Sequence, residues 1–309
     1  MKPPEPERPA GAPGVLVVLR PAEVLTVAVL GLAGALIARA PLFSIHTLLA
    51  APAAGALYAA ANAFSACFAA NEALRRRTPP GQQETDSRIT PLLWRLGWSL
   101  LLSGIAAACG VGRDGATVAV GLALVAIIPS MLPPAAWPGS AMCRGATFGF
   151  ALLLGLCAAG DGLGRCAGAA LPIGAFAVGW TMLGFSRRPG LPPNVGFFAL
   201  LHAAAALVFL ISSAAALPGR GGVPYPLEAV PFLGMLAAIG YVPLVRAVME
   251  PRRTHIRIAL REGLVGITLL AATLAAAHAG AVTGLLVALF WFPVRSACRE
   301  WPPPDGDSA

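Results

Sequence analysis

Charged side chains are scarce in this chain. Only 12% of its 309 residues are Asp, Glu, Lys or Arg, whereas roughly a quarter are charged in a soluble globular domain. Apolar residues make up 57% of the chain, and they form repeated runs of about 20 residues, the length that crosses the hydrocarbon core of a bilayer. These runs lack the alternating pattern of membrane β-strands. The composition therefore predicts an all-α integral membrane protein.

Lysine is almost absent as well. Of the 22 basic residues only Lys2 is a lysine, and the formal net charge is +8. In a soluble protein this excess would suggest a nucleic-acid partner, but arginine in the cytoplasmic loops of a membrane protein explains it better. We therefore expect the lipid bilayer, and no nucleic acid, as a partner.

The chain also lacks paired cysteines and the common catalytic motifs. Six cysteines are spread along it without any C-x-x-C pair, at Cys67, Cys109, Cys143, Cys157, Cys166 and Cys298. Cysteine inside a membrane helix behaves as a small apolar residue, so we expect free thiols. Phosphate-binding loops, serine-hydrolase elbows and zinc-protease helices are missing too, which excludes those enzyme classes.

Ten candidate spans follow from the apolar runs. They cover residues 22–40, 43–70, 92–112, 115–135, 142–160, 166–186, 195–217, 228–249, 256–278 and 280–297. The last two could instead form one long bent helix, which would make nine spans. We expect one bundle over residues 19–298, with disordered tails at 1–18 and 299–309, where proline is frequent.

The arginines set the orientation. With a cytoplasmic N-terminus and ten spans, 18 of the 22 basic residues fall on the cytoplasmic side. The outer segments then hold only Arg39, Arg113, Arg165 and Arg220. Since positive residues concentrate in cytoplasmic loops, we expect both termini in the cytoplasm.

Small residues predict how the helices pack. G-x-x-x-G spacing occurs at Gly145 and Gly149, and again through Gly160, Gly164 and Gly168. Glycine at this spacing lets membrane helices approach closely. We expect both glycine runs to lie at helix–helix contacts.

Two cytoplasmic loops are rich in arginine. The first, residues 71–91, contains Arg75, Arg76 and Arg77, and the second, residues 186–194, contains Arg187 and Arg188. Both open on the same side of the membrane, where guanidinium groups could bind the anionic head of an amphiphile. The alternative is that these arginines only set the topology and contact anionic lipids.

The first span begins with the sequence RPAEVLT, in which Arg20, Pro21 and Thr26 stand at fixed spacing. This start resembles the R-P-x-N-L-x-T motif of the UbiA superfamily of intramembrane prenyltransferases, with Glu23 where asparagine is usual. After the second span the family carries N-D-x-x-D-x-x-x-D and a basic segment. Here the matching positions are Asn62, Ala63, Ala66 and Ala70, followed by Arg76, Pro79 and Gly81.

The resemblance implies a UbiA-like bundle that transfers a prenyl group from an isoprenoid diphosphate to an aromatic or lipid-like acceptor. Magnesium held by the family's aspartates assists the departing diphosphate, but alanine supplies no oxygen ligand. Glu72 is the one weak candidate for a metal ligand, and it could instead pair with Arg75 or Arg76. We therefore expect impaired catalysis and no metal site unless Glu72 or another acid substitutes for the aspartates.

The substrate-binding residues implied are Asn62, Arg75, Arg76, Arg77, Arg187 and Arg188. Catalytic residues are left unassigned. The alternative function is a non-catalytic protein that binds a lipophilic metabolite or helps to transport it. A subset of the family that is found in bacterial metabolite clusters has a similarly altered second loop, so the expected location is the bacterial inner (plasma) membrane.

Overall fold

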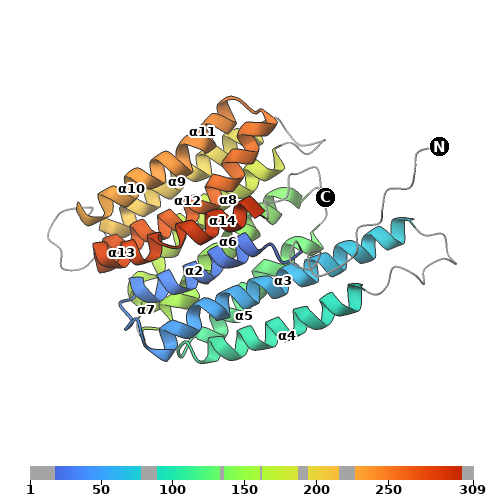
Figure 1. The fold of residues 1–309 in the computed structure, drawn as a ribbon, viewed down its shortest axis with the longest axis horizontal. Coiled ribbons are helices and arrows are strands. Elements are labelled where there is room, and N and C mark those ends of the chain that lie inside the picture. Colours follow the sequence, from blue (N-terminus) through green and yellow to red (C-terminus); the bar gives the residue numbers. More distant parts are fainter. Residues whose placement is uncertain are drawn as a thin grey trace.

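The computed structural model describes residues 18–77, 89–132, 136–160, 162–186, 194–215 and 227–300. Throughout these ranges the regular structure is helical and includes no strand. The helices run roughly antiparallel to one another in an elongated bundle (Figure 1). The chain is therefore an all-α protein, as its composition predicts.

The first half of the chain supplies α2 (Pro21–Ile37), α3 (Ile45–Arg77), α4 (Ile89–Cys109), α5 (Gly115–Met131) and α6 (Trp137–Leu156). The second half supplies α7 (Gly162–Cys166), η2 (Ala167–Ala169), α8 (Ala170–Phe185), α9 (Val195–Ala215), η3 (Leu227–Ala229), α10 (Val230–Leu236), the π-turn η4 (Ala237–Tyr241), α11 (Val242–Met249), α12 (Arg253–Ala279), α13 (Ala281–Ala288) and α14 (Trp291–Glu300).

These helices correspond to the ten predicted spans. In the described ranges, eight helical segments are long and apolar enough to cross a membrane. The other two, α2 and α5, are apolar helices of 17 residues each. The protein is thus an integral membrane protein. The predicted tails lie almost wholly outside the described residues.

The last two spans are separate helices and not one bent helix. α12 ends where Gly280 adopts a φ of 103°, a conformation that glycine tolerates and other residues avoid. α13 then turns back along α12, and a Cβ atom on Gly284 would lie 2.6 Å from the Cβ of Ala276. Gly280 therefore makes the turn between α12 and α13.

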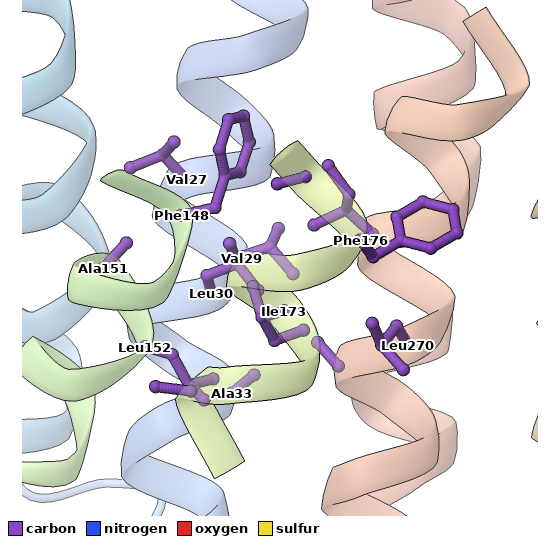
Figure 2. Packing of buried hydrophobic residues seen from close by; sticks show 14 of the residues in the cluster. Val27, Val29, Leu30, Ala33, Phe148, Ala151, Leu152, Ile173, Phe176 and Leu270 are labelled. Carbon is purple, nitrogen blue, oxygen red and sulfur yellow. The ribbon is translucent and has the colours of Figure 1, made fainter. Parts of the chain in front are cut away.

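The core of the bundle lies where α2, α6, α8 and α12 meet. Figure 2 shows Leu30 of α2, Leu152 of α6, Ile173 of α8 and Leu270 of α12 in this layer, and each of the four is fully buried. α12 is the most enclosed helix, because α2, α8, α11, α13 and α14 all pack against it. From residue 263 to 277 this helix is buried and almost entirely apolar on all sides, which is typical of such a central position.

Glycine allows the closest helix crossings. A Cβ on Gly155 of α6 would lie 1.9 Å from the carbonyl oxygen of Gly31 in α2, and one on Gly145 would lie 2.2 Å from Val178 of α8. Gly145 therefore lies at a helix contact as predicted. The prediction for Gly160, Gly164 and Gly168 is wrong, since a Cβ on any of them would meet nothing within 4 Å. They lie in and around the short α7 and η2, outside the long packed helices.

Candidate functional site

Arg75, Arg76 and Arg77 are the last three residues of α3. The sequence interpretation had placed them in a loop beginning at residue 71, and this boundary is wrong. The stretch Asn71–Arg77 contains mostly good helix formers, so α3 continues to its end. The side chains of Glu72, Arg75, Arg76 and Arg77 lie outside the described residues, as do Arg187 and Arg188 altogether.

The helices that lead to these two groups of arginines end on the same side. α3 and α8 both finish at the end of the bundle where α2 begins (Figure 1). We call this the inner end. α6 lies between α3 and α8, packing closely on α8 and touching α3. The start of α6 and the end of α8 lie together at this inner end, because the rings of Trp137 and Phe185 are in contact, with centroids 6.4 Å apart.

Asn62, the predicted substrate-binding residue of α3, has a structural partner. Its Nδ2 donates a hydrogen bond of 2.9 Å to the backbone oxygen of Leu19, just before α2. One turn earlier, the Tyr58 hydroxyl donates a short hydrogen bond to the Oε2 of Glu23. This face of α3 therefore holds the beginning of α2 in place.

Glu23 is the centre of the polar contacts at the inner end. Its side chain is 4% exposed, and its Oε1 lies 3.6 Å from the Nη1 of Arg20. We call Arg20, Glu23, Tyr58 and Asn62 the α2–α3 cluster. A buried carboxylate is costly in a membrane protein unless it is paired and hydrogen-bonded, and Glu23 has both kinds of partner.

Arg20 has an unusual backbone. Its φ of 51° and ψ of 66° place it in the left-handed region, which costs an L-residue about 1 kcal/mol or more. Pro21 follows at the first helical position, where its fixed φ suits a helix start. Burial alone would lower the pKa of the Arg20 guanidinium, but the negative charge of Glu23 raises it above its ordinary value. Arg20 therefore stays cationic at the inner end.

An aromatic row joins the α2–α3 cluster to the far side of the core. The ring of Tyr58 lies 6.1 Å from that of Phe148 in α6, which in turn lies 5.9 Å from the ring of Trp180 in α8. The indole Nε1 of Trp180 donates a 2.7 Å hydrogen bond to the Leu260 oxygen of α12. Three buried rings thus connect α3, α6, α8 and α12 below the inner end.

The described residues do not fit a magnesium site. Ala63 is fully buried and Ala66 and Ala70 are half-buried, and methyl groups supply no metal ligand. Among the residues that the structure describes, no three His, Cys, Asp or Glu side chains gather where they could hold a metal ion. Glu23 already has Arg20 and Tyr58 as partners.

Sequence reasoning missed the α2–α3 cluster as a unit. Asn62 was expected to contact substrate, and Glu23 was noted only as a departure from the family's asparagine. Two spacings carried the signal: Glu23 follows Arg20 by three residues, and Tyr58 precedes Asn62 by four. Both spacings bring side chains to one face of a helix, but neither reveals that the two faces meet.

The six cysteines are free thiols, as predicted. Cys67, Cys157 and Cys298 are buried, which is typical of cysteine acting as a small apolar residue.

Comparison with protein-family models and with curated proteins gives no match. Among solved structures, the chain is similar to one described as a digeranylgeranylglyceryl phosphate synthase in membranes. The match has a TM-score of 0.56 and 15% sequence identity, and it covers 86% of this chain and 97% of that one. The fold is UbiA-prenyltransferase-like. At this identity the likeness shows the fold alone, and the UbiA-like arrangement extends over nearly the whole bundle.

Proposed function

We propose that this protein is a UbiA-type intramembrane protein that binds an isoprenoid diphosphate and transfers its prenyl group to an aromatic or lipid-like acceptor. The observation that supports this most is the similarity of the whole bundle to a membrane prenyltransferase. The apolar tail would lie among the helices of the bundle, and the diphosphate would lie at the inner end, near the ends of α3 and α8.

Arginine is the group that this site offers to a diphosphate. Arg75, Arg76 and Arg77 end α3, Arg187 and Arg188 follow α8 in sequence, and Arg20, which is cationic at any relevant pH, directly precedes α2. Guanidinium binds phosphate oxygens through two parallel hydrogen bonds. In this proposal, cationic side chains supply the headgroup recognition that the family gives to magnesium and aspartate.

Ala63, Ala66 and Ala70 make the transfer slow in this proposal. Binding the diphosphate equally well before and during its departure does not accelerate the reaction. Without carboxylates at these positions, the developing charge on the leaving group loses a stabilisation worth several kcal/mol. The same three alanines favour the second candidate, a non-catalytic protein that binds a lipophilic metabolite or helps to transport it.

One experiment separates the two candidates. Purified protein is incubated with radiolabelled geranylgeranyl diphosphate, Mg²⁺ and a mixture of hydroxylated aromatic and glycerophosphate acceptors. A slowly formed prenylated product supports the transferase. Tight binding of the diphosphate without any product supports the non-catalytic protein, and absence of both binding and product contradicts both candidates.

Restoring the acids tests the reason given for slow transfer. The combined substitutions Ala63→Asp, Ala66→Asp and Ala70→Asp should raise the Mg²⁺-dependent rate at least about tenfold, equivalent to about 1.4 kcal/mol of barrier. Chelation of Mg²⁺ should remove this gain and leave the activity of the unmodified protein unchanged. A folded triple variant without any gain would show that the missing aspartates are not the cause.

A further inference from the structure

A second polar cluster lies where α14 packs against α12. The Oε1 of Glu262 accepts hydrogen bonds from the Nη2 of Arg261 at 2.8 Å and from the Nη2 of Arg295 at 3.3 Å. The guanidinium of Arg295 also lies over the ring of Trp291, 5.4 Å from its centroid. We call these four residues the α12–α14 cluster. Because two guanidinium groups surround one carboxylate, the cluster as a whole has a net positive charge.

Three polar atoms of this cluster are buried without a hydrogen-bond partner. They are the Oε2 of Glu262, the Nε of Arg295 and the Nε1 of Trp291. Glu262 is 5% exposed as a residue. Buried polar atoms nearly always have a partner, and an unpaired one destabilises the protein. One acceptor and two donors, unpaired in one small cluster, match a ligand that carries both hydrogen-bond acceptors and a hydroxyl donor.

The cluster continues outward as a basic surface. Arg253, Arg257 and Arg261 follow one another at four-residue spacing on α12, which places them along one side of the helix. Arg295 and Arg299 have the same spacing on α14. Arg253, Arg257 and Arg299 are exposed, and the side chain of Arg295 is 35% exposed. Arg295 therefore connects the buried atoms to the basic surface.

Two exposed apolar side chains follow members of this region in sequence. Ile258, which follows Arg257, is 45% exposed, and Phe292, which follows Trp291, is 63% exposed. Both belong to candidate membrane spans. Basic residues next to lipid-facing apolar residues at the inner end of a bundle suit a molecule with an anionic head and hydrocarbon tails.

We propose that the α12–α14 cluster binds an anionic phospholipid whose headgroup also carries a hydroxyl, with phosphatidylglycerol as the type. The phosphate oxygens accept from the Nε of Arg295 and the Nε1 of Trp291, and the hydroxyl donates to the Oε2 of Glu262. The single negative charge of the lipid balances the excess positive charge of the cluster. The acyl chains lie along Ile258 and Phe292. This proposal does not rest on the proposed prenyl diphosphate site.

The test is lipid retention by the purified full chain in native mass spectrometry, after incubation with phosphatidylglycerol or phosphatidylcholine. We expect at least about tenfold greater retention of phosphatidylglycerol. Equal retention of the two lipids would overturn the proposal. Displacement of phosphatidylglycerol by inorganic phosphate at equal concentration would also overturn it, since the ligand would then be the free anion.

Two variants and a matched control locate the site. Arg295→Lys keeps the charge but removes the planar fork of donors, including the Nε–H that the proposal gives to the phosphate, and it should weaken phosphatidylglycerol retention about fivefold, comparable to the loss of one hydrogen bond to a charged group. Arg257→Gln on the exposed side of α12 should weaken it similarly and covers the case in which Arg295→Lys does not fold. Arg113→Lys, exposed in the turn between α4 and α5, should change nothing. Equal losses in all three variants, or in none, would contradict the assignment.

Discussion

At the scale of single residues, the inner end of the bundle depends on how a few buried charges are paired. Glu23 is enclosed by Arg20 and Tyr58, which come from different elements. Breaking one member of such a pair leaves the other charge uncompensated, which costs more than the pair itself contributes. Removing a single partner from the α2–α3 cluster should therefore destabilise the protein.

Replacing Glu23 with glutamine should destabilise the protein by about 1–3 kcal/mol, because the guanidinium of Arg20 would lose its counter-charge. Thermal unfolding in detergent micelles would show this as a lower midpoint. Glu250→Gln is the control, because the side chain of Glu250 is 56% exposed and its contact with Arg252 is 3.9 Å long. Such a surface pair contributes at most about 1 kcal/mol. If both variants unfold alike, Glu23 lacks the role given to it.

Asn62→Ala distinguishes a structural role from a direct contact with substrate. Loss of the Nδ2 donor to Leu19 should lower stability by about 1 kcal/mol and weaken binding of geranylgeranyl diphosphate only in proportion to the disturbed start of α2. Unfolding curves and binding isotherms of the same preparation measure the two effects. Unchanged stability with a large loss of affinity would instead support the direct contact expected from the sequence.

At the scale of helices, contacts between glycines determine how closely the spans approach. Gly34 of α2 and Gly155 of α6 leave no space for a side chain where the two helices cross: a Cβ on Gly34 would lie 2.1 Å from the backbone oxygen of Leu152, and one on Gly155 would lie 1.9 Å from the backbone oxygen of Gly31. Lipid surrounds the bundle on the outside, so association of these two helices depends on close packing instead of exclusion of water. A substitution here acts on backbone atoms, which cannot rotate away.

Gly155→Ala should therefore be strongly destabilising. Overpacking typically costs about 1–3 kcal/mol, and the added methyl group meets the backbone of Gly31, so we expect aggregation or a much lower unfolding midpoint. Size-exclusion chromatography with fluorescence detection after heating measures this. Gly164→Ala is the control, because a Cβ there meets nothing within 4 Å. A heat-stable Gly155→Ala protein would contradict the crossing of α2 and α6.

The helices themselves could largely be predicted from the sequence, and their ends less well. Apolar runs identify spans because each must match the thickness of the bilayer. They do not show where a polar helix ends, so the extension of α3 to Arg77 was missed. The turn at Gly280 was left open, because a glycine between two alanines fits both a bent helix and a reversal.

The candidate site was harder to predict than the fold. Comparison with the family's motifs identifies Asn62 and the missing aspartates as positions of interest. It does not reveal the contact between Glu23 and Tyr58, which are 35 residues apart in sequence. The α12–α14 cluster joins Glu262 to Arg295, 33 residues away. Such pairings depend on which helices become neighbours, and neither hydropathy nor local spacing carries that information.

At the scale of the whole molecule, the chain has the fold of a membrane prenyltransferase, and most of the arginines placed by the structure lie at the inner end of the bundle. Three arginines lie toward the inner end: Arg20 directly before α2, Arg95 in the inner half of α4, and Arg144 in the inner half of α6. Two lie at the opposite end, where Arg39 follows α2 and Arg113 follows α4. This distribution supports the proposal that the inner end faces the cytoplasm.

A reporter fused after residue 309 tests the orientation. Alkaline phosphatase, which is active only outside the cytoplasm, should be inactive at this position, and a fluorescent protein should be bright. The same pair of reporters placed in the turn at Arg113 should behave in the opposite way. Active phosphatase at the C-terminus would overturn the proposed cytoplasmic location of the C-terminus and with it that of the arginine-rich end.

The most direct test of the central claim, headgroup recognition by arginine without a metal, is the affinity for geranylgeranyl diphosphate with and without a chelator. The account predicts equal affinity in both conditions, and a loss of about tenfold or more when Arg75, Arg76 and Arg77 are replaced by glutamine. Arg113→Gln should bind like the unmodified protein. An affinity that disappears with chelation, or that survives the triple substitution unchanged, would contradict the account.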